Sequence, residues 1–135
     1  MVLRGAYCLC IYITVDAEID VGALGRIRFP QGRYIYVGSA MNGLKARVCR
    51  HMNTSRGIYG AIHWHIDYLL KEPKVSIESI YIQETDRREE CIIASAISEL
   101  GKPVKGFGSS DCRCFSHLFM VEEFTFLTKM GLETW

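Results

Sequence analysis

Short runs of alternating apolar and polar residues along the chain predict β-strands. Residues 5–14, GAYCLCIYIT, predict a first strand because they are rich in aromatic and β-branched side chains. Residues 25–29 and 33–38 predict the two arms of a hairpin, and the intervening Pro30-Gln31-Gly32 has the composition of its turn. Two further strands are expected at residues 74–84 and 116–123.

Elsewhere the apolar residues recur every three or four positions, which predicts helices. Leu44, Val48 and Met52 form one such series, and Asn42 lies near the expected start of that helix. Further helices are expected at residues 61–71, 86–100 and 124–132, with a glycine-rich loop at residues 101–114. This order of elements predicts an α/β fold, a sandwich in which a small central antiparallel sheet is flanked by helices.

The length and composition suit one domain. The chain has 135 residues, of which 49% are hydrophobic, so a single domain over residues 1–135 is expected. No apolar run approaches the length of a bilayer span, and the apolar N-terminus lacks a signal-peptide cleavage site. We therefore expect a cytoplasmic protein without a membrane segment, whose six cysteines are reduced and buried.

The charge is balanced overall but uneven along the chain. The formal net charge is +1, which does not indicate a polyanion-binding protein by itself. Between residues 26 and 56, however, every charged residue is basic. A solvated basic face and a surface for nucleic acid explain this block equally well. Its members are Arg26, Arg28, Arg33, Lys45, Arg47, Arg50 and Arg56.

Several polar side chains fall where strands or helices meet solvent. Arg47 and His51 are four residues apart, so both are expected on one helix face, at the boundary between core and solvent. Tyr36 lies near the end of the preceding strand, and Gly38 leaves room for close approach to the backbone. Glu90 heads the apolar side of the third helix, where a carboxylate needs a cation or a donor.

Two neighbouring acids are interpreted differently from Glu90. Asp86 and Glu89 fit a capping box at the start of the third helix, with each side chain satisfying a free amide. The apolar side behind Glu90 is expected to comprise Ile93, Ala94, Ile97 and Leu100.

These residues together resemble the GIY-YIG nuclease family. The string GAY at 5–7 resembles its first strand motif, and YVG at 36–38 resembles the second. Arg47 and His51 match the arginine and histidine of the following helix, and Glu90 matches the acidic residue of a later helix. The strings HWHIDYL and GFGSSDCRCFSHLF resemble the Uri-type subfamily, which is sometimes fused to a base-excision DNA glycosylase.

The resemblance implies a GIY-YIG-like domain that cleaves phosphodiester bonds in DNA, in repair or processing, with Mg²⁺ or Mn²⁺. Glu90 would hold the ion, and Arg47 would pair with phosphate oxygens. Tyr7 or Tyr36, its pKa lowered by nearby cations, would orient or deprotonate the water, assisted by His51. A partner protein in DNA repair would supply targeting. Contacts with nucleic acid are expected from Gly38, Lys45, Arg50, His63 and Ser110.

Two other functions compete with the nuclease. The first is a nucleic-acid-binding module that kept the fold without catalysis, although such a module has no need of Glu90. The second is an interaction domain stabilised by zinc. Cys112, Cys114 and His117 offer three ligands, whereas structural zinc sites have four, so zinc is the less favoured interpretation.

Polar residues of the second helix and of the glycine-rich loop remain to be interpreted. His63 and His65 are two apart on a helix and face opposite sides, so they are not expected to chelate one ion. His63 and Asp67 are four apart and could form a hydrogen-bonded pair, which would either support the fold, the favoured interpretation, or orient the histidine toward DNA. Asp111 and the two serines before it are expected to make polar loop contacts.

Overall fold

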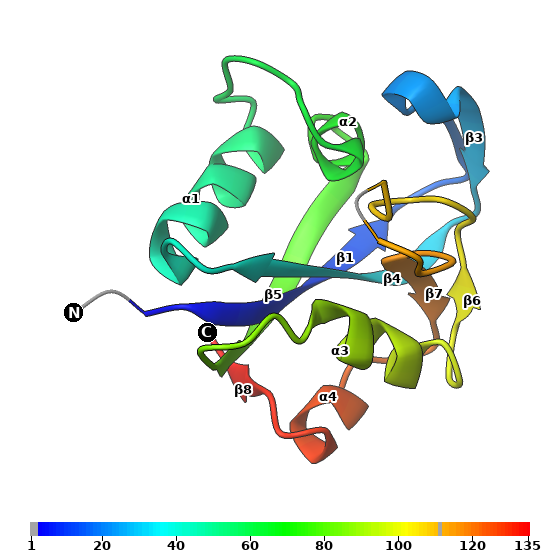
Figure 1. The fold of residues 1–135 in the computed structure, drawn as a ribbon. Helices are drawn as coiled ribbons and strands as arrows, with labels where there is room; N and C mark the ends of the chain where they lie inside the picture. Colours follow the sequence, from blue (N-terminus) through cyan, green and yellow to red (C-terminus); the bar gives the residue numbers. More distant parts are fainter. Residues whose placement is uncertain (1–2, 111) are drawn as a thin grey trace.

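The structure is a computed structural model that describes residues 3–110 and 112–135, and it has a mixed α/β fold (Figure 1). The elements are β1 (Gly5–Ile13), β2 (Ala17–Asp20), the 3₁₀ turn η1 (Gly22–Leu24), β3 (Arg26–Phe29), β4 (Gly32–Ala40), α1 (Leu44–Ser55), α2 (His65–Leu70), β5 (Val75–Glu84), α3 (Glu90–Ile97), β6 (Lys102–Pro103), β7 (Leu118–Val121), α4 (Phe126–Lys129) and β8 (Glu133–Thr134). The predicted fold class is confirmed.

Six strands form an antiparallel sheet in the order β6-β7-β4-β1-β5-β8. In its centre, β1 pairs with β4 so that Tyr7 lies opposite Gly38 and Leu9 lies opposite Tyr36. Along the edge away from β1, strand β4 pairs with β7, but only over the residues from Arg33 to Tyr36. The last part of β4 therefore extends beyond the end of β7, and this is where a cleft forms.

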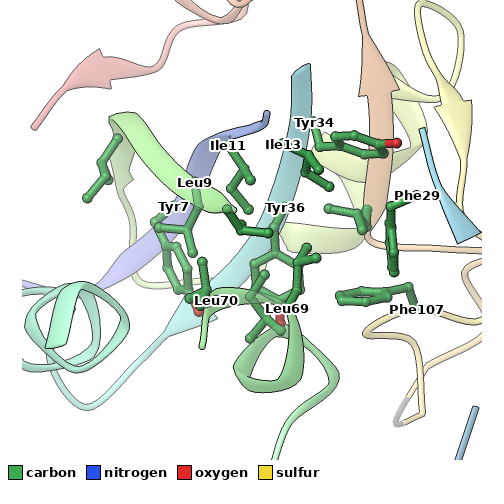
Figure 2. Close-up of a cluster of buried hydrophobic side chains, with 14 of the residues drawn as sticks. Tyr7, Leu9, Ile11, Ile13, Phe29, Tyr34, Tyr36, Leu69, Leu70 and Phe107 are labelled. Carbon is green, nitrogen blue, oxygen red and sulfur yellow. The ribbon is translucent and has the colours of Figure 1, made fainter. Parts of the chain in front are cut away.

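Helices cover both faces of the sheet (Figure 1). One face packs against α1 and α2, and the buried side chains of Tyr7, Leu9 and Ile11 meet Leu69 and Leu70 there (Figure 2). The alternate residues of β1 point to the opposite face, which packs against α3 and α4. Because both faces are buried, β1 is apolar at almost every position.

None of the helices in the described part of the chain combines the length and the apolar character that crossing a membrane requires.

The predicted hairpin between residues 25 and 38 is wrong. Although β3 and β4 follow one another, β3 pairs with β2 in a separate two-stranded sheet. Opposite charges face one another across these two strands, where Arg26 contacts Glu18 at 3.2 Å and Asp20 at 3.4 Å. The strand β2 was not predicted, since it has only four residues and a single fully buried side chain.

The third helix begins later than predicted. It starts at Glu90, and Glu89 occupies the N-cap position without a capping side-chain hydrogen bond. The predicted capping box of Asp86 and Glu89 is therefore wrong. The helix also ends at Ile97, so Leu100 lies beyond it and is exposed. Helices α2 and α4 are likewise shorter than predicted, and the two-residue strands β6 and β8 were not predicted.

Candidate active site

A cleft of about 550 Å³ lies at the end of β4 that β7 leaves uncovered. It brings together residues from both helical layers of the molecule. We call one side the arginine wall, formed by Tyr7, Tyr36, Arg47 and Trp64. We call the other side the carboxylate wall, formed by Glu90, Gly108, Cys112 and His117. Between them lie Val37, Gly38, Ser39, Met41, Asn42 and Arg88.

A slightly larger hollow of about 620 Å³ lies elsewhere, between the end of α3 and β7. It is lined by residues such as Glu99, Lys102 and Phe126, and by none of the predicted site residues. The cleft at the end of β4 is therefore the better candidate for an active site.

Gly38 has a steric reason to be glycine. A Cβ at this position would clash with the ring and hydroxyl of Tyr7, which lies opposite in the β1–β4 register. The phenol of Tyr7 thus fills the space that the missing side chain provides. The sequence predicted that a group would approach the backbone closely at Gly38, and that group is the phenol of Tyr7.

Tyr7 and His51 form a buried pair. The Tyr7 Oη lies 2.8 Å from His51 Nε2, and the imidazole is completely buried. Burial lowers the pKa of His51 to about 3, so its ring is neutral at physiological pH. In the tautomer protonated at Nδ1, Nε2 accepts the Tyr7 proton. Within the described residues, Nδ1 has no hydrogen-bond partner.

The pKa of neither tyrosine is lowered, which contradicts the expectation from the sequence. Burial raises the pKa of Tyr7 to about 12, and the nearby Arg47 offsets only part of that rise. Burial also raises the pKa of Tyr36 strongly. Both side chains are therefore neutral phenols in the free protein. His51 was predicted at the boundary between core and solvent, but its side chain is completely buried behind Tyr7.

Arg47 is held at the cleft by the backbone and by an indole. Its Nη1 donates to the carbonyl of Ser39 at 3.1 Å, and its guanidinium carbon lies 4.5 Å from the centre of the Trp64 ring. This cation–π contact keeps the guanidinium beside the cleft without neutralising its charge. Arg47 therefore remains available to an anion.

Trp64 is positioned by a buried ion pair. Asp67 is completely buried and accepts two hydrogen bonds from Arg50, at 2.8 and 2.9 Å. The same carboxylate accepts the backbone amides of His63 and Trp64, each at 3.0 Å. The guanidinium of Arg50 lies 4.2 Å from the centre of the Trp64 ring. Asp67 therefore ties α1 to the start of α2.

Glu90 reaches the cleft from the first turn of α3. Its carboxylate is half-buried and accepts the hydroxyl of Ser39. Since the carbonyl of Ser39 also accepts Arg47, this one serine contacts both charged groups. The structure thus brings Tyr7, Tyr36, Arg47 and Glu90 to one cleft, as predicted for their positions.

The residues expected to contact nucleic acid are spread more widely. Gly38 lines the cleft, and Lys45 is exposed on α1. Arg50 and His63 line a neighbouring hollow, with the Arg50 charge paired to Asp67. Ser110 is exposed in the glycine-rich loop. The predicted contact of Asp111 lies outside the described residues.

The two histidines of HWHIDYL support the fold. The backbone amide of His63, and not its imidazole, contacts Asp67. His65 Nδ1 accepts the amide of Gly108 at 2.8 Å, and its ring packs against Phe107. The contact of His65 fastens the glycine-rich loop to α2. The predicted pairing of the His63 side chain with Asp67 is wrong, because Asp67 accepts the backbone amide of His63.

The basic block is not one free surface. Arg26 pairs with Glu18 and Asp20, and Arg28 pairs with Asp16 at 3.3 Å. The acids that the block itself lacks are thus supplied by β2 and by the residue before it. Of the block, Arg47 lines the cleft, where Arg88 adds a second positive charge.

A group of thiols and an imidazole adjoins the carboxylate wall. One ligand atom from each of Cys91, Cys112, Cys114 and His117 lies within 4.8 Å of the others, so the group could hold a metal ion. The last three of these residues were predicted as possible zinc ligands, whereas Cys91 was not. All six cysteines are free thiols, as predicted, but only Cys8 and Cys10 are buried, so the predicted burial is wrong for the other four.

Ser39, Trp64 and Arg88 were also missed as cleft residues. Ser39 directly follows the predicted YVG motif, and Trp64 lies within the HWHIDYL string, so their neighbours were the available signals. Neither Ser39 nor Trp64 has a charge that would have singled it out.

A comparison with protein families identifies the chain. A family model described as "Domain of unknown function DUF123" matches residues 6–133. The chain belongs to this family. Comparisons with curated proteins and with solved structures gave no match. The matched DUF123 region contains every described residue of both walls.

Proposed function

We propose that this DUF123 chain is a metal-dependent endonuclease of the GIY-YIG type that hydrolyses phosphodiester bonds in DNA during repair or processing. The observation that carries the proposal is the shared cleft of Tyr7, Arg47 and Glu90, which come from three different elements. A guanidinium, a carboxylate and a phenol coupled to a buried imidazole are the groups that this reaction needs.

The charges at the cleft suit a phosphate. Arg47 and Arg88 provide two cations, and Glu90 is the single carboxylate among the described residues that line the cleft. The planar fork of Arg47 can pair with the two non-bridging oxygens of a phosphodiester. Trp64, which is partly exposed beside Arg47, offers an aromatic face to a flanking base or sugar.

Glu90 fits the role of a metal ligand. Mg²⁺ is commonly bound by one or two carboxylates, together with water and substrate phosphates, so one protein ligand is sufficient in a site of this kind. Glu90 provides that carboxylate, and Ser39 orients it through the hydroxyl hydrogen bond. A bound Mg²⁺ or Mn²⁺ would supply charge stabilisation on the phosphoryl and leaving oxygens.

Tyr7 and His51 would activate the water. Because the pKa of Tyr7 is about 12, the phenol does not act as a preformed phenolate. Instead Tyr7 takes the proton from the water while its own proton passes to His51 Nε2, 2.8 Å away. The His51 pKa of about 3 disfavours this transfer in the free protein. The positive charge of Arg47 opposes protonation of His51, and a phosphate bound to Arg47 would offset that charge. The carboxylate of Asp67 favours the protonated His51 further.

The expected substrates are defined by shape more than by base sequence. Contacts with phosphate position a nucleic acid but do not read its sequence. The cleft is lined mainly by groups suited to phosphate, sugar and stacking, so targeting to a particular lesion or structure would come from a partner protein.

The proposal is tested with a panel of labelled single-stranded, duplex and flap DNA and matching RNA, incubated with Mg²⁺, Mn²⁺ or EDTA. We expect metal-dependent products from DNA with the wild-type chain. Arg47→Ala should slow cleavage about 100-fold, as expected for removal of one transition-state donor. Arg33→Ala is the matched control, because Arg33 is exposed at the far end of β4.

Two results would count against the proposal. Equal rates for Arg47→Ala and Arg33→Ala would mean that the cleft is not the site of cleavage. Retention of DNA without products under every metal would favour a binding module without catalysis. Products from RNA alone would reassign the substrate while leaving the cleft in place.

A further inference from the structure

Three cysteines and a histidine converge beside the carboxylate wall from two separate segments of the chain. Cys91 lies in the first turn of α3, while Cys112, Cys114 and His117 lie in the loop before β7. His117 Nε2 is 3.3 Å from the sulfur of Cys112 and 3.8 Å from the sulfur of Cys91. All four candidate ligand atoms lie within 4.8 Å of one another.

The two S···N distances are close to the edge of a zinc tetrahedron. With Zn–S near 2.3 Å and Zn–N near 2.0–2.1 Å, a sulfur and a nitrogen on one tetrahedral ion are about 3.5 Å apart. The two observed S···N distances, 3.3 and 3.8 Å, lie on either side of that value. A single ion could therefore bind with small movements of the side chains.

His117 is prepared to donate a lone pair to such an ion. Its Nδ1 lies 3.1 Å from the carbonyl of Val37, and a carbonyl can only accept. The proton of the neutral ring is therefore on Nδ1, which leaves Nε2 unprotonated and facing the thiols. Metal-binding histidines commonly have this arrangement, in which a carbonyl fixes the tautomer and the ring orientation. His117 is also almost fully buried, so the ring has little freedom to turn away.

We propose that Cys91, Cys112, Cys114 and His117 bind one structural Zn²⁺. Four protein ligands fill a tetrahedron and leave no open position for substrate, which distinguishes a structural site from a catalytic one. Binding would release the three thiol protons, because the thiolate is the form that binds zinc. The site is distinct from Glu90 and uses none of the groups to which the proposed hydrolysis assigns a chemical role.

The zinc would hold the carboxylate wall together. Cys91 directly follows Glu90, and the other three ligands belong to a segment with little regular structure. One ion bound by all four would fix the start of α3 against this loop. It would thereby fix the position of Glu90 relative to the arginine wall.

The test measures metal content and spectrum on the whole chain without nucleic acid. We expect one zinc ion per chain in the purified wild-type protein, and loss of that ion in Cys114→Ser. Cys49→Ser is the matched control, because Cys49 is an exposed cysteine on α1, outside the cluster. It should keep one zinc per chain.

Cobalt substitution of the wild-type chain keeps the test decisive if Cys114→Ser fails to fold. Co²⁺ should give the thiolate charge-transfer band and the intense visible bands of a tetrahedral site, and added Zn²⁺ should remove both. A wild-type chain that binds neither ion, or whose cluster cysteines are joined by a disulfide, would overturn the proposal. Iron in place of zinc would overturn the assigned metal. None of these outcomes depends on cleavage of DNA, so this proposal and the nuclease proposal fail separately.

Discussion

The two walls of the cleft are built in different ways. The arginine wall stands on β1, β4, α1 and the start of α2. Its Tyr7 and Tyr36 are part of a continuous buried core, and His51 lies behind Tyr7. The carboxylate wall consists of the first turn of α3 and the loop before β7, where half-buried thiols gather beside His117. The two walls meet at Ser39, which contacts both Arg47 and Glu90.

This difference indicates that each wall depends on a different kind of interaction. Core packing and a buried ion pair fix the arginine wall, so substitutions that weaken the core should disturb it first. The carboxylate wall has fewer core contacts and, on our proposal, depends on a metal. A chelator should therefore disturb the carboxylate wall while leaving the arginine wall folded. The following predictions test this separation.

The largest expected loss of stability comes from Asp67→Ala, which acts on the arginine wall alone. It leaves Arg50 and two backbone amides without their buried acceptor. Because Arg50 is partly exposed, we expect a loss of about 3 kcal/mol in the free energy of unfolding, at the lower end for broken buried pairs. Urea denaturation measures this value.

The control for Asp67→Ala is Asp20→Ala, which breaks an exposed ion pair with Arg26 and should leave stability nearly unchanged. Zinc content should be the same in both variants. A loss of zinc in Asp67→Ala while it remains folded would show that the walls are not independent.

Acid should destabilise the arginine wall through His51. Its folded pKa of about 3 lies below the unfolded value near 6.5, so the unfolded state binds the proton first as the pH falls. The stability that neutral His51 contributes is therefore complete above about pH 6.5 and declines below it. We expect a loss of about 2–3 kcal/mol between pH 7 and pH 4.5.

Denaturation curves across this range, compared with those of His51→Gln, measure the histidine contribution. The dependence on pH should be shallower in His51→Gln and unchanged in His63→Gln, because His63 is exposed. An equally steep curve in His51→Gln would assign the acid sensitivity to other groups.

Gly38→Ala should disturb the packing of Tyr7 in the arginine wall. The added Cβ would overlap the Tyr7 phenol, and overpacking of this kind costs about 2 kcal/mol. Gly60→Ala is the matched control, because an added Cβ there meets nothing within 4 Å. Thermal unfolding of the two variants should separate them clearly, and equal melting temperatures would mean that Tyr7 does not need the space at Gly38.

The smallest effect is expected where the walls meet. Ser39→Ala removes the hydroxyl that orients Glu90 but keeps the carbonyl that accepts Arg47. Loss of such a supporting hydrogen bond should weaken metal-dependent activity about 10-fold. The concentration of Mg²⁺ giving half-maximal cleavage should rise, with zinc content unchanged. No change in Mg²⁺ dependence would remove Ser39 from the metal site.

Local patterns predicted the elements that define the arginine wall. The apolar run of β1, the run of β4 and the series Leu44/Val48 of α1 each occur in a continuous segment. The resemblance to a known family then indicated that residues from separate elements would meet. The structure places Tyr7, Arg47 and Glu90 at one cleft accordingly.

Features that depend on distant residues could not be predicted in the same way. Strand β3 pairs with β2 and not with the adjacent β4, and no local signal in the sequence excluded the adjacent hairpin. Cys91 precedes the other cluster cysteines by a whole helix and loop, so its spacing did not suggest a shared site. The raised tyrosine pKa reflects burial depth, which the sequence pattern does not specify.

On the proposed function, Glu90 and Arg47 act together on one phosphate and one metal ion. The most direct measurement is the single-turnover rate of Mg²⁺-dependent DNA cleavage by the wild-type chain, Glu90→Gln and the exposed control Glu78→Gln, each shown to be folded. We predict a loss on the order of 10³-fold for Glu90→Gln and none for Glu78→Gln. Equal rates for all three proteins would contradict the account.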